Sequence, residues 1–520
     1  MAERTGKQSS SRREALLAGA KLVAGAVLLG PAKLLGARAA AQGAGAAAAR
    51  VYDVRDYGAI GDGTTLDTAA IQRAIDAAAA AAAESLAASG AASGAASGAA
   101  TASGAATTAA SDAAGAAAVG RARVLLRGGR KYLVGTITLR GGIDFHLADD
   151  AELRVSTNRT DYSGGAVLTA QDAKGLRISG TGTVNGRGLE FMSGYDKANE
   201  WWLPKGWRPR LFQLIGCNDL VVRDLTVAAA PDWSVHLIGC DGVLVDNVKI
   251  RNELKIPNCD GIDPDHCRNV EIRNCDIVCG DDAIAIKTSK QYVSYGASTN
   301  IHVHDCKMTT QDAGVKIGTE TFSDISGVRI ERCQIAQSSR GLGIQLRDSA
   351  NVSDIEFSDI QFTSRYFSDP WWGRGESISL TAIPRTPQST IGTLSGVRIH
   401  NVTGRAENSV RVEGSAASRI ADVTLQNVAI TLDRWTSYPG GVFDNRPTSA
   451  EPDIEKHATP GYSIRHADQV RLKQCSVAWG KNLPDYFSHA LEAEDAHGLE
   501  LSGFTGRAAH PERDSDISII

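Results

Sequence analysis

The densest group of acidic side chains lies in the segment PNCDGIDPDHCRNVEIRNCDIVCGDDAIAIKT, from Pro257 to Thr288. Asp260 and Asp281 are 21 residues apart, and Asp282 follows Asp281 directly, after Gly280. Like charges that pack together raise at least one pKa, so a protonated acid can stand beside an ionised base. Glycoside hydrolysis with inversion needs such a pair: an acid for the leaving oxygen and a base for water, about 6.5–9.5 Å apart.

Other interpretations of this acidic segment compete with catalysis. Asp263, Asp265 and Asp276 are expected to end strands and cap turns, because Asp is common where strands bend. Clustered Asp oxygens also suit calcium. The nine cysteines form no complete zinc pattern of two spaced pairs. The cysteines therefore predict no structural zinc site.

The elements that must position these carboxylates repeat along the chain. One pattern recurs from Cys217 onward, as in CNDLVVRDLTV, CDGVLVDNVKI and CRNVEIRNCDI. It consists of a small or polar residue, alternating Val, Ile or Leu, a polar Asn, Asp or Arg, and a second apolar pair. The first six copies start 23 to 32 residues apart. Short strands at this period, with no helix between them, predict a parallel β-helix whose rungs stack on one another.

The rung period also places individual residues. Asp260 and Asp281 are about one rung apart, so they should lie on adjacent rungs, about 4.8 Å from each other, with outward-splayed side chains that span the catalytic gap. The cysteines recur at fixed places in successive rungs. We predict that they form two interior ladders of small apolar side chains, one of Cys217, Cys240 and Cys267 and one of Cys275, Cys306 and Cys333.

The domain organisation follows from local composition. Residues 51–520 are predicted to form one β-helix domain, with a short helix at TAAIQRAIDAA (68–78) that caps the open first rung. A low-complexity insert at 77–119 departs from Ala, Gly, Ser and Thr only at Glu84, Leu86, Asp112 and Val119. Its first part could prolong the helix, and its ASGA units beyond Ser89 predict a flexible loop.

The N-terminus has the features of an export signal. Ser11-Arg12-Arg13 precedes an apolar, alanine-rich stretch, which is the form of a twin-arginine signal. Small residues at Ala37, Ala39 and Ala41 offer cleavage sites. We expect a signal peptide over residues 1–41 and a mature protein in the periplasm or outside the cell, with no membrane segment after cleavage.

Composition excludes several classes of function. The chain has 520 residues, with 55 Lys and Arg against 59 Asp and Glu, and a net charge of −4. This balance gives no basic footprint for nucleic acid. The 42% hydrophobic content excludes a wholly disordered chain. The expected partner is a saccharide, and the expected oligomeric state is a monomer.

NCDGID (258–263) and CGDDAIAIKT (279–288), at this separation, resemble the polygalacturonase-like family, glycoside hydrolase family 28. VYDVRDYGAIGDGTTLDTAAIQRAID (51–76) and GTGTVNGRG (180–188) are similar to segments of such pectin-degrading proteins. The resemblance implies a right-handed parallel β-helix and inverting hydrolysis of pectic polysaccharide without a metal. In keeping with it, we expect no metal and no other cofactor. It implies that Asp281 is the general acid, and that Asp260 and Asp282 position and activate the water.

The chain departs from polygalacturonases at the positions that grip galacturonate. Ala313 stands where the family has a histidine, and Gly343 and Gln345 stand where it has arginine and lysine. We predict that Arg340, Arg347 and Gln345 contact the substrate instead. The losses favour another pectic substrate, such as rhamnogalacturonan, or exo action on oligosaccharides.

Aromatic residues in projecting loops suit stacking on sugar rings. Trp371 and Trp372, in YFSDPWWGRGE (366–376), are predicted to bind substrate, and such loops can close one end of a groove. DNRP (444–447) is a further loop, to which the sequence assigns no role. Two other functions stay open at this point: a calcium-dependent polysaccharide lyase and a non-catalytic glycan-binding β-helix protein.

Overall fold

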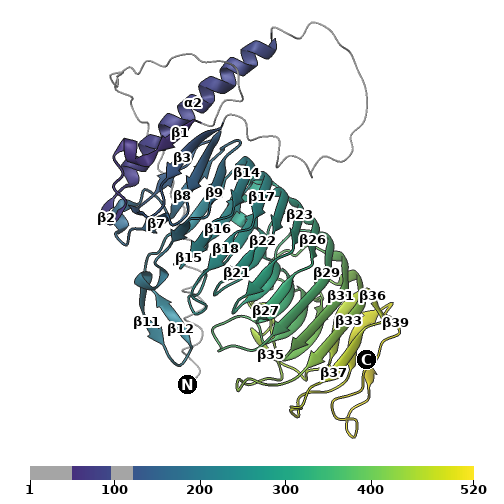
Figure 1. The fold of residues 1–520 in the computed structure, drawn as a ribbon. Coiled ribbons are helices and arrows are strands. Elements are labelled where there is room, and N and C mark those ends of the chain that lie inside the picture. The colour runs from purple at the N-terminus through teal and green to yellow at the C-terminus, as the bar shows by residue number, and fades with distance from the viewer. Residues whose placement is uncertain (1–49, 95–120) are drawn as a thin grey trace. The chain divides into compact units, whose positions relative to one another are not determined.

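The computed structural model describes residues 50–94 and 121–520, with the side chains of 86–94 left out. The predicted signal peptide and the rest of the insert lie outside the described residues. Within them, 36 strands belong to one continuous sheet whose neighbours pair in parallel (Figure 1). This arrangement confirms the predicted parallel β-helix.

Each rung contributes strands to separate stacks, and two stacks frame the acidic segment. Series A pairs in the order β8 (Ala166–Gln171), β13 (Arg210–Ile215), β16 (Val235–Ile238), β19 (Ile262–Asp265), β22 (Ile284–Thr288), β25 (Ala313–Thr321), β28 (Arg340–Leu346), β30 (Glu376–Ala382) and β32 (Asn408–Glu413). Series C pairs in the order β7 (Glu152–Val155), β10 (Thr183–Asn185), β15 (Thr226–Ala228), β18 (Lys249–Arg251), β21 (Asp276–Val278) and β24 (Lys307–Thr309).

Along each strand, alternate side chains face the apolar core and the outside of the β-helix. In β28, Leu342, Ile344 and Leu346 are fully buried in the apolar core, so Gly343 and Gln345 face the other way. Asparagines at rung corners, such as Asn247 and Asn274, adopt positive φ, a conformation that Asn tolerates better than most residues. Each rung can therefore turn sharply without a glycine.

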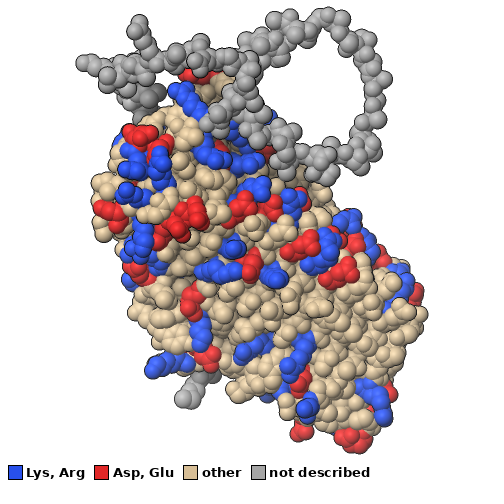
Figure 2. All heavy atoms as spheres, in the orientation of Figure 1, with Lys and Arg blue, Asp and Glu red and all other residues tan. Residues whose placement is uncertain are grey.

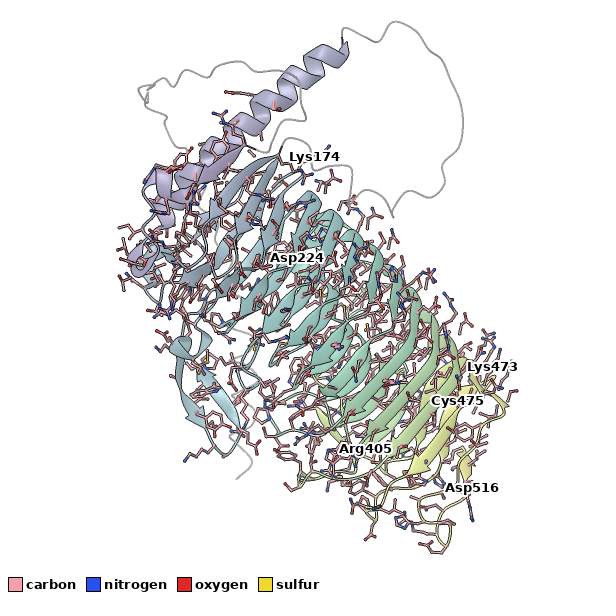
Figure 3. All side chains as sticks on the ribbon, in the orientation of Figure 1. Lys174, Asp224, Arg405, Lys473, Cys475 and Asp516 are labelled. Carbon is pink, nitrogen blue, oxygen red and sulfur yellow. The ribbon has the colours of Figure 1, made fainter. Side chains whose placement is uncertain are left out.

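The cysteines are interior, as predicted. All nine are free and buried. Side-chain hydrogen bonds link Cys240 to Cys217 and Cys267, and the same contact links Cys306 to Cys275 and Cys333. Figure 3 labels Cys475, which is buried, and Lys473 two residues earlier, which ends β36 and is exposed. Gln474 between them has positive φ, so the chain turns at this corner.

The N-terminal end of the stack is covered by helix α2 (Thr68–Gly94) (Figure 1). Ile71, Ala74, Ile75 and Ala78 are fully buried in the core, so the predicted cap is present. The helix is much longer than the predicted span of 68–78, and it continues past Ser89, where a flexible loop was expected. Alanine has the highest helix propensity, which accounts for the extension.

Long connections gather at one corner of the rungs, where a series C strand leads into the next series A strand. We call these turns the C–A corner. The connection after β10 carries an antiparallel hairpin of β11 (Met192–Asp196) and β12 (Trp201–Pro204). A second hairpin, β34 (Val442–Asp444) with β35 (Ile454–Lys456), lies in the connection from β33 (Ile420–Leu432) to β36 (Tyr462–Lys473).

The surface carries mixed charge. Figure 2 shows Lys and Arg interspersed with Asp and Glu on the visible face, with no large area of one sign. Among the described residues, no helix is both long and apolar enough to span a bilayer.

Candidate active site

The three predicted catalytic aspartates lie on successive turns of the C–A corner. Asp260 follows β18, and Asp281 and Asp282 follow β21. Gly280 permits the tight approach of these turns, because a Cβ atom at this position would lie 2.3 Å from the Ile256 carbonyl oxygen. The backbone N–H of Gly261 donates to the Asp282 carbonyl (2.9 Å), which fixes one turn against the next.

The carboxylates converge on one point. One oxygen from each of Asp260, Asp281 and Asp282 lies within 4.8 Å of the other two, and all three residues are buried. The predicted outward splay is therefore wrong: these oxygens are closer together than the gap of about 6.5–9.5 Å that is typical of inverting enzymes. The turns therefore hold the three carboxylates close together instead of spreading them across such a gap.

Hydrogen bonds distinguish the three carboxylates. Asp281 accepts the backbone N–H groups of Asn258 (2.9 Å) and Asp282 (3.0 Å). Asp282 accepts the N–H of Ala313 (3.2 Å) and the Lys316 ammonium (2.7 Å). Asp260 keeps one buried oxygen, Oδ1, without a hydrogen-bond partner. Burial, followed by the charges of Asp263 and Asp281, raises the pKa of Asp260 well above its ordinary value.

Sequence reasoning missed Asp312 and Lys316, which complete the cluster from the next rung. Burial, together with Asp282 and Asp281, raises the pKa of Asp312 well above its ordinary value. Burial opposes the charge of Lys316, but Asp282, Asp312 and Asp281 outweigh it and raise the pKa of the lysine. The available signal was a lysine in the apolar first half of a strand, four residues after an Asp that immediately precedes that strand.

Asp263 also belongs to the site and is more than a strand end. It is fully buried and its Oδ1 lies 3.0 Å from the Lys287 Nζ. Burial raises the pKa of Asp263 to about 6, although Lys287 acts in the opposite direction. The cluster thus contains five buried aspartates and two buried lysines.

Two cationic side chains lie against the ring of Trp233. The Arg210 guanidinium and the Lys287 ammonium each lie 3.9 Å from the centre of the Trp233 ring, within cation–π range. His236 lies 3.2 Å from Asp265 and is fully buried, and burial lowers its pKa to about 3. His236 is therefore neutral and forms part of the wall of the site.

The side chains of Arg340, Arg347 and Gln345, which the sequence predicts to contact substrate, are buried under a later segment. Arg340 and Arg347 donate to the backbone carbonyls of Asp444 (3.5 Å) and Asn445 (3.2 Å). Gln345 donates to the carbonyl of Arg446 (3.2 Å). We call residues 443–447 the plug, since they cover series A directly after the rung that carries Lys316.

The two tryptophans that the sequence predicts to bind substrate lie in different environments. Trp371 is 1% exposed, and its ring packs edge-on against Trp201 at 5.9 Å, so it joins two loops and presents no open face to a sugar. Trp372 is half-buried, and its ring centre lies 5.5 Å from the Lys316 Nζ. Of the two, only Trp372 is placed beside the carboxylates with a partly accessible ring.

The loops of the C–A corner form a connected rim. The Ser368 hydroxyl donates to the carbonyl of Asn199, which lies between the two strands of the β11–β12 hairpin (2.5 Å). A side-chain hydrogen bond joins Tyr438 to Glu200 of the same hairpin. The plug is fixed from the same side, because Arg446 donates to its own neighbour Asp444 (2.6 Å) and to the Trp371 carbonyl (2.7 Å). The rim thus spans the rungs on both sides of the carboxylates.

Chemically, this arrangement offers acids and bases in one buried cluster. Three carboxylate oxygens at this separation could also hold a divalent cation. The ammonium groups of Lys316 and Lys287 already supply positive charge within the cluster. Acid–base chemistry on a bound substrate is therefore available without a further ion.

Comparison with known proteins decides the family. Residues 126–438 match glycosyl hydrolases family 28. The chain belongs to this family. As a family 28 glycosyl hydrolase, it carries its carboxylate cluster inside the matched region.

Individual proteins that are similar to this family 28 protein are consistent with the family match. A probable polygalacturonase from Vitis vinifera is 25% identical over 472 residues, which cover 81% of this chain and 85% of the relative. An endo-polygalacturonase from Pectobacterium carotovorum subsp. carotovorum is 23% identical over 328 residues, covering 58% of this chain and 78% of the relative. The family 28 exopolygalacturonase of Yersinia enterocolitica shares the fold, with a TM-score of 0.62 at 16% identity over 88% of this chain and 79% of that one.

Proposed function

We propose that this glycoside hydrolase cleaves pectic polysaccharide from a chain end, with Asp281 as the acid and with Asp260 and Asp282 as the groups that activate water. The observation that carries the proposal is the convergence of these three carboxylates beside the Lys316–Asp282 ion pair. The lysine offsets part of the negative charge, while burial and the neighbouring carboxylates raise the pKa values of Asp260 and Asp312, so a proton is held within the cluster.

In the proposed reaction, Asp281 gives its proton to the glycosidic oxygen as the bond from the anomeric carbon to that oxygen breaks. Water attacks the anomeric carbon from the opposite face, and its proton passes to Asp282 or Asp260. The product has the inverted anomeric configuration. The close approach of the carboxylates makes product stereochemistry a necessary test, because separations of about 5–5.5 Å are typical of retaining enzymes.

A pectic substrate is supported by the relatives, which are polygalacturonases by description. The residues that bind a uronate in those enzymes are missing, but other cations surround the cluster. Arg210, Lys287 and Lys316 are contributed by β13, β22 and β25, all of them series A strands. We assign uronate binding to these three groups in place of the buried Arg340 and Arg347.

End-wise cleavage is supported by the plug. Downstream of Lys316, every described side chain of β28, β30 and β32 is buried. Upstream, Thr169 of β8 and Gln213 of β13 are half-buried and reach the surface. The strands β16, β19 and β22, which lie between β13 and Lys316, are also buried. We therefore propose that the substrate chain extends from the carboxylates toward β13 and β8 and ends at the plug, as an exo-acting enzyme requires.

The decisive experiment incubates the mature protein with polygalacturonate, rhamnogalacturonan and their reduced oligosaccharides in the presence of EDTA. We expect saturated, short products that appear from one chain end, with inverted configuration by NMR. Asp281→Asn should remove this activity, whereas Asp276→Asn, which alters a half-exposed Asp of β21, should retain it. Unsaturated products that require calcium would instead identify a lyase, and binding without turnover would identify a non-catalytic protein.

We further propose that the protein is exported through the twin-arginine pathway and acts as a monomer. The Ser11-Arg12-Arg13 segment before the apolar stretch supports export. Arg12→Lys together with Arg13→Lys should leave the protein inside the cell if this pathway is used. Light scattering of the purified mature protein tests the monomer.

A further inference from the structure

One arginine side chain ties together three successive turns of the C–A corner. Arg208 lies shortly before β13, and its Nη1 donates to the carbonyls of Pro231 (2.8 Å) and Pro257 (2.5 Å). Its Nη2 donates to the side-chain oxygen of Asn258 (2.8 Å), and its Nε lies 3.0 Å from the Asp232 carboxylate. These partners lie in the turns that lead into β16 and β19. One guanidinium group therefore fixes the entry to three neighbouring series A strands.

The last of these turns contacts the proposed acid. The backbone N–H of Asn258 donates to Asp281 (2.9 Å), and the Asn258 Nδ2 lies 3.5 Å from the same carboxylate oxygen. Because a guanidinium can only donate, Arg208 requires the Asn258 Oδ1 to face it, and the Nδ2 group is then directed to Asp281. Asn258 also has a φ of 58°, a conformation that residues other than glycine seldom adopt. Arg208 thus holds both donors of Asn258 in place.

The spacing of the turns makes Asn258 the link between Arg208 and Asp281. The series A order β13–β16–β19–β22 places the Arg208 turn three rungs before the Asp281 turn. At about 4.8 Å per rung, this separation is about 14 Å along the axis, too far for the arginine to contact the carboxylate directly. Asn258 lies two rungs after Arg208 and one rung before Asp281. Any effect of Arg208 on the acid therefore passes through the Asn258 turn.

The Arg208 guanidinium is not placed to bind substrate. Its side chain is 12% exposed, and its Nε, Nη1 and Nη2 atoms all have partners in the turns. Arg210, two residues later, is the nearby arginine that we assign to uronate binding. The Arg210 Nε lies 3.6 Å from Asp232, and this pair does not depend on Arg208. A defect at Arg208 should therefore appear in the chemical step more than in substrate affinity.

We propose that Arg208 is a positioning residue for the acid step. It orients Asn258, and Asn258 holds the Asp281 carboxyl group where it meets the glycosidic oxygen. The proposal rests on the proposed function, because it takes Asp281 as the acid. A misplacement of about 1 Å by a residue far from the reacting atoms can cost about 100-fold in rate, so a contact of this kind is large enough to measure.

The test compares two leaving groups in Arg208→Ala. On a reduced galacturonate oligosaccharide we expect kcat to fall roughly 100-fold with little change in KM. On a dinitrophenyl galacturonide, whose leaving group departs without a proton, the fall should be much smaller. Free guanidinium ion should restore part of the lost kcat, and sodium ion at the same concentration should not. Arg419→Ala, which removes an arginine paired with Asp468 and Asp495 at the C-terminal rungs, is the matched control and should change neither constant.

Equal falls on both leaving groups, or a folded Arg208→Ala that guanidinium does not rescue, would overturn the proposal. Thermal denaturation checks the fold, and if Arg208→Ala does not fold, Arg208→Lys gives the same comparison, because an ammonium keeps the charge but not the fork of donors. If the unmutated protein does not cleave the dinitrophenyl compound, guanidinium rescue on the oligosaccharide decides. Failure of the proposed function would appear separately, as persistent hydrolysis by Asp281→Asn or as no hydrolysis by the unmutated protein.

Discussion

At the scale of single residues, the central property of the site is its imbalance of buried charge. Five aspartates share the cluster with two lysines, at Lys287 and Lys316, so the lysines can offset only part of the negative charge. The remainder is relieved by protonation, as the raised pKa values of Asp260 and Asp312 indicate. A buried group that cannot be paired takes up a proton, and the site thereby holds an acid and a base together.

The ion pair of Lys316 with Asp282 should control the pH dependence of catalysis. Lys316→Met removes the ammonium that lies 2.7 Å from Asp282, so the cluster loses one of its two buried cations and its negative charge is less well offset. We expect kcat at neutral pH to fall roughly 100-fold, a typical size for loss of acid–base assistance. The acidic limb of the pH–rate profile should move to higher pH, and Lys316→Arg should reverse part of that movement. A reduced kcat with an unmoved profile would show that Lys316 has only a structural role.

Asp312 should make the fold more stable in acid than at neutral pH. Its folded-state pKa is raised above the ordinary value of 3.8, mainly by burial. A group with a raised pKa contributes stability that is fully present below its unfolded-state pKa and is lost as the pH rises through the folded-state pKa. Asp263, with a pKa of about 6, contributes in the same direction between about pH 4 and 6. Asp312→Asn removes its own part, so the difference between the Tm at pH 5 and at pH 8 should become smaller than in the unmutated protein. An unchanged difference would contradict this account.

Residue spacing predicted some of these groups and not others, for a physical reason. Asp260, Asp281 and Asp282 were predictable because about one rung of sequence separates Asp260 from the Asp281–Asp282 pair, and adjacent rungs are one rung spacing apart in space. Lys316 takes its role from pairing across rungs, and an isolated strand shows it only as an outward residue. The burial of Arg340 and Trp371 was not predicted, because their partners come from segments far away in the chain: residue 444 covers Arg340, and Trp201 packs on the Trp371 ring. Local spacing cannot reveal such contacts.

At the scale of elements, the turns of the C–A corner determine where the carboxylates point. The repeat predicted the strands well, because a period-2 pattern with polar corners defines each rung. It did not predict the direction of the side chains at the corner, where alternation stops. Contacts between successive turns decide that direction, as at Gly280, where the carbonyls of Ile256 and Leu254 leave no space for a side chain.

Gly280→Ala should therefore inactivate the enzyme without touching a reactive group. Its Cβ would lie 2.3 and 2.7 Å from two backbone carbonyl oxygens, so the turn before Asp281 must shift. We expect a loss of about 1–3 kcal/mol in the free energy of unfolding, typical of overpacking, together with at least a tenfold fall in kcat/KM. Thermal denaturation and oligosaccharide kinetics measure both. Gly164→Ala, at a site with no atom within 4 Å of the added Cβ, is the matched control. Full activity in Gly280→Ala would show that the turn can yield.

At the scale of the whole β-helix domain, the strand series is continuous but access to it is not. The series A sheet is partly exposed at β8 and β13, whereas β16, β19 and β22 and then β28, β30 and β32 are entirely buried. Downstream of Lys316, part of the cover is one insertion, between β33 and β36, that folds back over Arg340 and Gln345 of β28. A solenoid presents a long uniform surface by default, and an inserted connection on one rung is a direct means of ending it.

Shortening that insertion should convert end-wise cleavage into internal cleavage. Asp444 is held by Arg340, Arg374 and Arg446, and burial of this carboxylate is outweighed by these cations, which lower its pKa. Arg446→Ala removes one of them and both of its loop contacts, and replacement of residues 436–458 by a short Gly-Ser linker removes the plug entirely.

We expect the linker variant to open the downstream side of the groove, so that a long polymer loses viscosity before short products accumulate. Arg446→Ala should show a smaller change in the same direction. Chromatographic product sizes, measured together with viscosity, distinguish the two modes of cleavage. A folded linker variant that still releases only terminal products would mean that the direction of the substrate chain is limited by the rim of Trp371 and the β11–β12 hairpin. The end wall would then belong to the loops that join the two sides of the carboxylate cluster, and the plug would serve to neutralise the arginines beneath it.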